Sequence, residues 1–115
     1  EFKNSFYFFY SNYFFKKMAH PLSTISKIRA ANKKAGHYFF SPKTMNFFNS
    51  KAYGITKTTE KGAYFITSEF FVHSDGSKIK TYKVRFCHLS GVIDSVKGEI
   101  FNSYDEAKSC LNSLN

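Results

Sequence analysis

Basic and apolar side chains alternate along one stretch in the second half of the chain. Lys83 and Arg85 are interleaved with Tyr82, Val84 and Phe86. Because successive side chains of a strand point to opposite faces, the apolar residues would face a core and the two cations would project from the other face of a sheet. A cationic sheet that carries an aromatic side chain can bind a phosphate backbone.

The candidate binding residues therefore lie on this sheet face or at its rim, and one of them is an aromatic that offers a stacking surface. They are Lys57, Lys61, Phe65, Lys78, Lys83, Arg85 and Lys97. The alternative interpretation is that the cations only solubilise an open sheet face and protect edge strands from pairing.

The net charge also favours an anionic partner. The chain has 115 residues and a formal net charge of +9, which suits nucleic acid, an acidic protein surface or an anionic membrane. A helix expected from Pro21 to Gly36 adds a cationic face, made by Lys27, Arg29, Lys33 and Lys34. A basic amphipathic helix can lie on nucleic acid or on a membrane, and the alternative is a solvated outer face.

Motifs for catalysis and metal binding are missing from the sequence. Of the histidines and cysteines, only Cys87 and His88 are adjacent, and neighbours on a strand point to opposite faces. The chain has no G-x-S-x-G motif, no P-loop and no dinucleotide-binding glycine motif. We therefore expect no enzyme, no cofactor and no metal site. Two cysteines are too few for a disulfide framework, which indicates reduced thiols and a cytoplasmic location.

The elements expected to position the candidate residues form one α+β domain. Alternating patterns predict strands over residues 51–58, 63–72, 79–87 and 92–101, joined by tight turns into a four-stranded antiparallel meander. N-terminal helices over 21–36 and from Pro42 to Phe48 precede this sheet. A C-terminal helix, capped by Ser103 and Glu106, is expected to pack on one sheet face through Ala107, Cys110, Leu111 and Leu114.

Three local features extend this prediction. The aromatic run from His37 to Phe40 is expected to be buried. Met45, Phe47 and Phe48 are the expected core-facing residues of the second helix, and a β-bulge or strand end is expected at residues 70–72. Gly91 closes the turn before the last strand and suits a positive φ angle.

Residues 1–17 differ in composition from the rest, because nine of them are Phe or Tyr without a helical or strand period. We expect this segment to be a non-native or disordered aromatic leader, with the natural start at Met18, and residues 18–115 to form the single domain. The alternative is an aromatic anchor for a membrane or a partner. Without the leader the formal charge is +7, so the domain itself is basic.

One segment resembles a known family. The residues from Gly36 to Ser50 read GHYFFSPKTMNFFNS, which is similar to a segment of small bacteriophage and prophage proteins of unknown function. The stretches 64–69, 82–85 and 91–96 also resemble that family, and the similarity spans residues 23–114. The resemblance implies a phage or mobile-element origin. Small proteins of that kind are often host-takeover or anti-defence factors, including CRISPR inhibitors.

Two functional hypotheses follow. In the first, the chain is an anti-defence inhibitor or adaptor that docks on a host protein or nucleoprotein complex in the bacterial cytoplasm. In the second, it binds DNA or RNA directly through the basic sheet face, with a contribution from the first helix. We expect no stable membrane association, and open edge strands would allow a homodimer.

Overall fold

The computed structural model describes residues 20–47, 49–96 and 100–114. Its elements follow the order α2 (Ile25–Lys34), α3 (Pro42–Phe47), β1 (Lys51–Thr59), β2 (Gly62–Val72), β3 (Lys78–His88), β4 (Ile93–Ser95) and α4 (Tyr104–Ser113). The leader predicted at residues 1–17 lies outside the described residues. Within the described part of the chain, the helices lack the length and apolar content that crossing a membrane requires.

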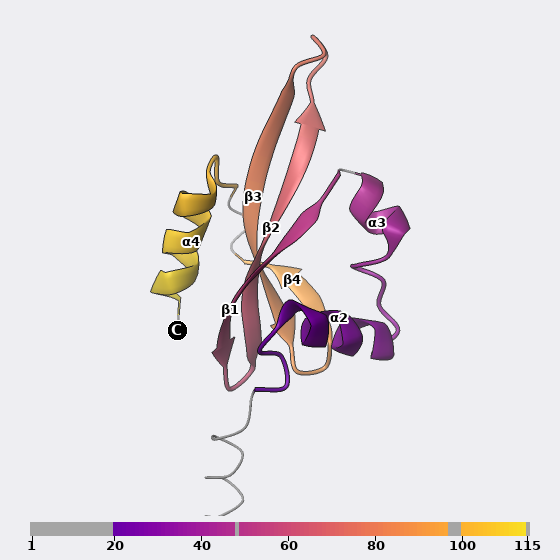
Figure 1. Ribbon diagram of the computed structural model, residues 1–115, viewed down its shortest axis with the longest axis vertical. Helices are drawn as coiled ribbons and strands as arrows, with labels where there is room; N and C mark the ends of the chain where they lie inside the picture. The colour runs from indigo at the N-terminus through magenta and orange to yellow at the C-terminus, as the bar shows by residue number, and fades with distance from the viewer. Residues whose placement is uncertain (1–19, 48, 97–99, 115) are drawn as a thin grey trace, which may run out of the picture.

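The four strands form one antiparallel sheet in the order β1-β2-β3-β4, which confirms the predicted meander and α+β class. The β2–β3 ladder is continuous from Gly62↔His88 to Val72↔Lys78. Of the two alternatives predicted for residues 70–72, the strand end is confirmed, because β2 ends at Val72. The β-bulge is wrong there, because the irregularity lies in β1 between Ala52 and Thr56. The ladder therefore runs unbroken to the end of the hairpin, which extends beyond the helices (Figure 1).

The last strand is shorter than the pattern predicts. The residues of β4 are Ile93–Ser95, and Phe101 pairs with Tyr82 only as an isolated bridge. Residues 97–99, in the middle of the predicted strand, lie outside the described part of the chain.

Helix α4 covers one face of the sheet, as the apolar stripe predicts (Figure 1). The Ser103 hydroxyl accepts a hydrogen bond from the Glu106 N–H at 3.2 Å, so the cap forms where expected. Ala107 and Leu111 are buried against Ile66 and Val84. Burial of a large apolar side chain such as Leu111, Ile66 or Val84 stabilises the fold by about 1.5–3 kcal/mol. The sum of these contributions accounts for the position of this helix.

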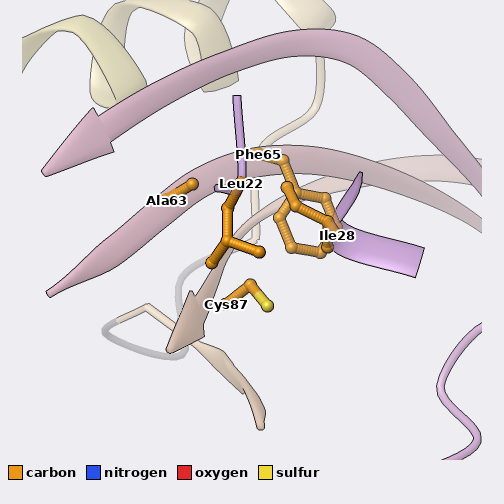
Figure 2. Close-up of a cluster of buried hydrophobic side chains, with 5 residues drawn as sticks. All are labelled: Leu22, Ile28, Ala63, Phe65 and Cys87. Carbon is orange, nitrogen blue, oxygen red and sulfur yellow. The ribbon is translucent and has the colours of Figure 1, made fainter. Parts of the chain in front are cut away.

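Helix α2 covers the opposite face of the sheet. The Thr24 hydroxyl caps it by accepting a hydrogen bond from the Lys27 N–H. Figure 2 shows the result: the apolar residues of this segment pack onto the strands in a buried cluster of Leu22, Ile28, Ala63, Phe65 and Cys87. Both faces of the sheet are therefore covered over part of their length, and the layers are helix, sheet and helix.

The segment between α2 and α3 differs from the prediction. Phe39 and Phe40 are half-buried against the α2 cluster, whereas His37 and Tyr38 are exposed, so the expectation that the whole run is buried is wrong for those two. Phe47 was expected to face the core and is 76 % exposed, and Phe48 lies outside the described residues. Met45 is half-buried.

Candidate functional site

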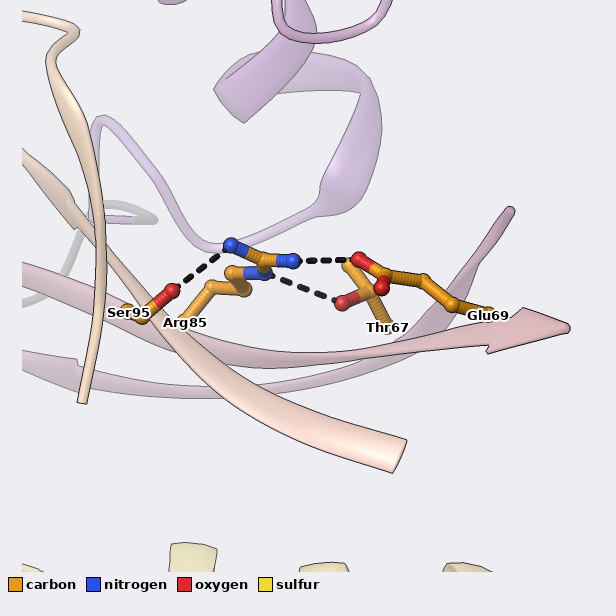
Figure 3. Close-up of polar contacts among 4 residues, drawn as sticks. All are labelled: Thr67, Glu69, Arg85 and Ser95. Carbon is orange, nitrogen blue, oxygen red and sulfur yellow. Dashed lines mark hydrogen bonds and ion pairs between the residues drawn. The ribbon is translucent and has the colours of Figure 1, made fainter. Parts of the chain in front are cut away.

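The predicted cationic face of the sheet is not open, because α2 and the segment before α3 lie over it. Arg85 projects to this face as predicted, but all three groups of its guanidinium are engaged (Figure 3). Its nitrogens donate to Thr67 Oγ1 at 3.1 Å, to Ser95 Oγ at 2.7 Å and to Glu69 Oε1 at 2.6 Å, and the Phe39 ring lies 5.2 Å away. The Arg85 side chain is only 13 % exposed. It serves to hold the fold together rather than to bind phosphate.

The electrostatics of this ion pair agree with that role. Burial lowers the pKa of the Arg85 guanidinium, while the Glu69 carboxylate opposes that shift. Both side chains are nearly buried, and removing one partner would leave the other charge without compensation. Lys83 is half-buried on the same face, where it pairs across the ladder with Thr67.

Phe65 is wrong as a predicted stacking surface, because its side chain is fully buried. The rings of Phe39 and Phe40 lie 6.2 and 5.9 Å from the Phe65 ring, and Ile28 of α2 belongs to the same cluster. This aromatic side chain is part of the core.

The remaining predicted residues do not form one surface. Lys57 lies on the opposite sheet face, where its Nζ donates to the Asn112 carbonyl at 2.8 Å. Lys61 lies in the β1–β2 turn and Lys78 at the far end of the β2–β3 ladder. At about 3.3 Å per residue, the length of the ladder separates those two by roughly 30 Å. Lys97 lies outside the described residues.

The net charge is concentrated in one part of the chain instead. Residues 20–59 contain seven Lys and Arg residues and no Asp or Glu. The other described residues contain six Lys and Arg and six Asp and Glu, so their formal charges cancel. The whole net charge of the described residues therefore comes from α2, α3 and β1.

Exposed cations of α2 and α3 flank the exposed rings of His37 and Tyr38 along the chain. We name this group the α2–α3 surface and define it as Arg29, Lys33, Lys34, His37, Tyr38 and Lys43. Within the described part of the chain, Lys33, Lys34 and Lys43 form no ion pair. Like charges without a neutralising carboxylate raise the local concentration of anions.

A first hollow lies between the C-terminal half of α2 and the segment that follows it. It has a volume of about 330 Å³. Its lining residues are Arg29, Asn32, Lys33, His37, Tyr38, Phe40, Ser41 and Pro42. The guanidinium of Arg29 lies 5.1 Å from the centre of the Phe40 ring, which holds this cation at the edge of the hollow.

A second hollow lies on the other side of Tyr38, between α3 and the sheet. It has a volume of about 820 Å³. Its lining residues are Tyr38, Phe39, Ser41, Lys43, Thr44, Met45, Phe47, Ser50, Glu69 and Arg85. The Arg85–Glu69 pair thus forms part of its wall, and α3 contributes the exposed Phe47 and the half-buried Met45. Tyr38 and Ser41 line both hollows.

Hydrogen bonds fix the backbone that carries Tyr38. The Tyr38 carbonyl accepts from the Ser41 N–H at 3.2 Å and from the Thr44 hydroxyl at 2.9 Å. The next residue is fixed as well, because the Phe39 N–H donates to Asn32 Oδ1 at 3.0 Å. A side chain that is 70 % exposed is therefore presented from an ordered backbone.

Two lysines on the α4 face are engaged with tyrosines. Lys80 Nζ lies 5.5 Å from the Tyr82 ring and 5.9 Å from the Tyr53 ring, and Lys51 Nζ lies 5.2 Å from the Tyr53 ring. Burial opposes ionisation of Tyr53, but the Ser68 hydroxyl and the Lys80 ammonium outweigh it and lower the pKa of the phenol. The Tyr53 hydroxyl in turn raises the pKa of Lys80. These contacts join the strands to one another, so Lys51 and Lys80 have a structural role on this face.

Among the described residues, no three His, Cys, Asp or Glu side chains are placed to hold a metal ion. Cys87 and Cys110 are free thiols, and burial raises the pKa of Cys87 to about 11. A thiol that keeps its proton in this way is a poor nucleophile.

Sequence reasoning identified the cationic residues of α2 but missed the contributions of Tyr38, His37 and Lys43. The sequence did contain a usable signal, because the absence of acidic residues from 20 to 59 sets this third of the chain apart. The pattern within 37–40 gave no such signal, because a short aromatic run without a period does not show which rings are exposed.

The chain matches the model of a family of unknown function, DUF7447, over residues 24–111. No curated protein and no solved structure matches the chain. Because the family match covers most of the sequence, the chain belongs to this family of unknown function.

Proposed function

We propose that this protein binds nucleic acid through the α2–α3 surface and that binding, without catalysis, is its activity. The supporting observation is the separation of charge: every net positive charge of the described residues comes from residues 20–59, which lack acidic residues altogether, and four of the seven cations there belong to the α2–α3 surface. Lysine and arginine that neutralise phosphates release condensed counterions, and this release supplies most of the sequence-independent affinity for nucleic acid.

This proposal replaces the sheet face with the helical face as the binding site. Arg85 is paired with Glu69, and Lys57 lies on the α4 face with its ammonium on the Asn112 carbonyl, so these two cations do not form one phosphate site. The exposed cations Lys33, Lys34 and Lys43 have no such partner among the described residues.

A charge-reversal experiment tests the proposal. The double variant Lys33→Glu with Lys43→Glu changes two elements of the α2–α3 surface, and the matched control Lys61→Glu with Lys108→Glu makes the same charge change at exposed positions elsewhere. Binding of random-sequence DNA and RNA is measured across a salt series by fluorescence anisotropy. With about four phosphates neutralised, log K should fall with log salt with a slope of roughly −3 to −4.

The surface variant should lose more than about tenfold in affinity and reduce the magnitude of the slope by about 2. The control should lose less, because its cations lie outside the interface, and circular dichroism should show both variants folded. Equal losses in the two double variants would mean that binding follows net charge alone, and no binding at low salt would reject nucleic acid as the partner.

A second candidate is an anti-defence inhibitor or adaptor of phage origin that docks on a host protein or nucleoprotein complex in the bacterial cytoplasm. The observation that favours it is the exposure of Phe47 (76 %) beside Tyr38 (70 %), since aromatic side chains are enriched in protein interfaces. It predicts that one host protein co-purifies with the chain from nuclease-treated lysate and that Phe47→Ala abolishes this. Retention of the same partner by the variant would argue against docking at the second hollow.

A further inference from the structure

Tyr38 borders both hollows on the cationic side of the molecule. Its side chain is 70 % exposed and lines both the first and the second hollow. Its backbone is held by the Ser41 N–H and the Thr44 hydroxyl. An exposed aromatic ring that borders both hollows is accessible to planar groups from each of them.

The first hollow has the composition of a site for a base with its phosphate. Rings of Tyr38 and Phe40 and the Pro42 side chain supply apolar lining, and Arg29 and Lys33 supply positive charge. Its volume of about 330 Å³ lies at the lower end of the range for small-molecule sites, roughly 300–1,000 Å³. It therefore suits a single nucleotide unit rather than a larger ligand.

The second hollow also combines apolar and cationic side chains, and its lining contains Glu69, which is paired with Arg85. Met45 and Phe47 supply apolar surface and Lys43 supplies positive charge. Its volume of about 820 Å³ is larger than that of the first hollow. Aromatic and cationic side chains thus alternate across the surface, from Lys33 through Tyr38 to Lys43.

Such alternation favours a single strand over a duplex. The bases of a duplex are stacked on one another and their faces are hidden, so an exposed aromatic ring gains little from them. Single strands expose their bases, which stack on aromatic side chains while the backbone follows a cationic groove.

We infer that the α2–α3 surface takes single-stranded nucleic acid, with one base in each hollow, on either side of the Tyr38 ring. This inference rests on the proposed function and specifies its ligand. Lys33 and Lys43 neutralise the phosphates on either side, and Tyr38 supplies stacking that does not depend on base identity.

The experiment compares one mixed-sequence oligonucleotide of about 12 nucleotides, a length typical of single-strand sites, with the same sequence as a duplex. Affinities are measured across a salt series that starts at about 50 mM, for the whole chain and for the variants Tyr38→Ala and Tyr38→Phe. Leu89→Ala is the control, because it removes a side chain that is 53 % exposed in the β3–β4 turn.

The single strand should bind at least about tenfold more tightly than the duplex. Tyr38→Ala should lower single-strand affinity by about five- to hundredfold, as expected for the loss of a stacking aromatic, and should leave the salt slope unchanged. Tyr38→Phe should restore affinity because it keeps the ring, and Leu89→Ala should change nothing.

Three results would overturn the inference. Equal affinity for single strand and duplex, with no effect of Tyr38→Ala, would leave nucleic-acid binding intact and remove the single-strand site. Binding of polyglutamate as tight as that of the single strand would identify a general anion surface. No binding of either oligonucleotide at about 50 mM salt, where electrostatic binding is strong, would reject the proposed function itself.

Discussion

The side chain of Asn32 connects the cationic helix to two other segments, and its removal gives a quantitative test of the structure. Asn32 is 2 % exposed. Its Nδ2 donates to the Gly91 carbonyl at 2.8 Å, and its Oδ1 accepts from the Phe39 N–H at 3.0 Å. Asn32→Ala leaves both backbone groups without these partners.

The expected cost follows from those two bonds. Leaving a buried donor or acceptor unsatisfied costs about 1–3 kcal/mol, so two such groups cost roughly 2–6 kcal/mol. Alanine regains about 0.6 kcal/mol through its higher helix propensity. We expect the free energy of unfolding to fall by about 1.5–5 kcal/mol and Tm by roughly 6–20 °C for a domain of this size.

Urea denaturation followed by circular dichroism measures this change. Asn112→Ala is the matched control. Asn112 is an exposed asparagine in α4, so its replacement by alanine should change stability only through the higher helix propensity of alanine. A cost for Asn32→Ala no larger than that for Asn112→Ala would refute the inference that these hydrogen bonds hold α2 to the 37–42 segment and the β3–β4 turn.

Two further predictions concern the core. Gly91 has a φ of +94° and its backbone lies against the Ala31 carbonyl, so Gly91→Ala should lower the free energy of unfolding by about 2–4 kcal/mol through backbone strain and steric overlap. The control Gly76→Ala, at a φ of +85° with open space around it, should cost clearly less. Equal losses in the two variants would contradict the contact between Gly91 and Ala31. Burial raises the pKa of the Cys87 thiol to about 11, so the folded state keeps a proton that the unfolded state loses above about pH 8.5. In a thiol-reagent assay at about that pH, Cys87 should therefore react only after denaturation, whereas Cys110 should react in the folded protein; equal native rates would be inconsistent with the burial.

The sheet and its α4 face could be predicted because two independent patterns agree there. Tyr82 and Val84 alternate with polar residues along β3, and Ala107 and Leu111 recur at helical spacing in α4. Each pattern requires an apolar partner, and the tight turn at Gly91 leaves little freedom in how the strands connect.

The opposite sheet face was misread because a pattern of polar residues does not show whether water or protein satisfies them. Arg85 and Glu69 sit sixteen residues apart and neutralise each other beneath the Phe39 ring. Phe65 carried a contrary signal, since its register neighbours on that face include the apolar residues Ala63 and Cys87. Pairing across strands, which determines these contacts, is not visible from one strand alone.

The candidate site could be predicted only in part. The cations of α2 follow from the sequence, but the hollows depend on how the 37–42 segment folds back over α2. That path is set by two hydrogen bonds of the Asn32 side chain, which accepts from the Phe39 N–H and donates to the Gly91 carbonyl. No local propensity encodes them.

Mapping of amide chemical shifts during titration with a single-stranded oligonucleotide tests the central claim most directly. The largest shifts should fall on residues 29–47, with the greatest at Tyr38 and its neighbours, and the β3 residues Lys78 and Lys80 and helix α4 should change little. Shifts concentrated on β3 or α4, or an absence of shifts at low salt, would contradict a nucleic-acid site on the α2–α3 surface.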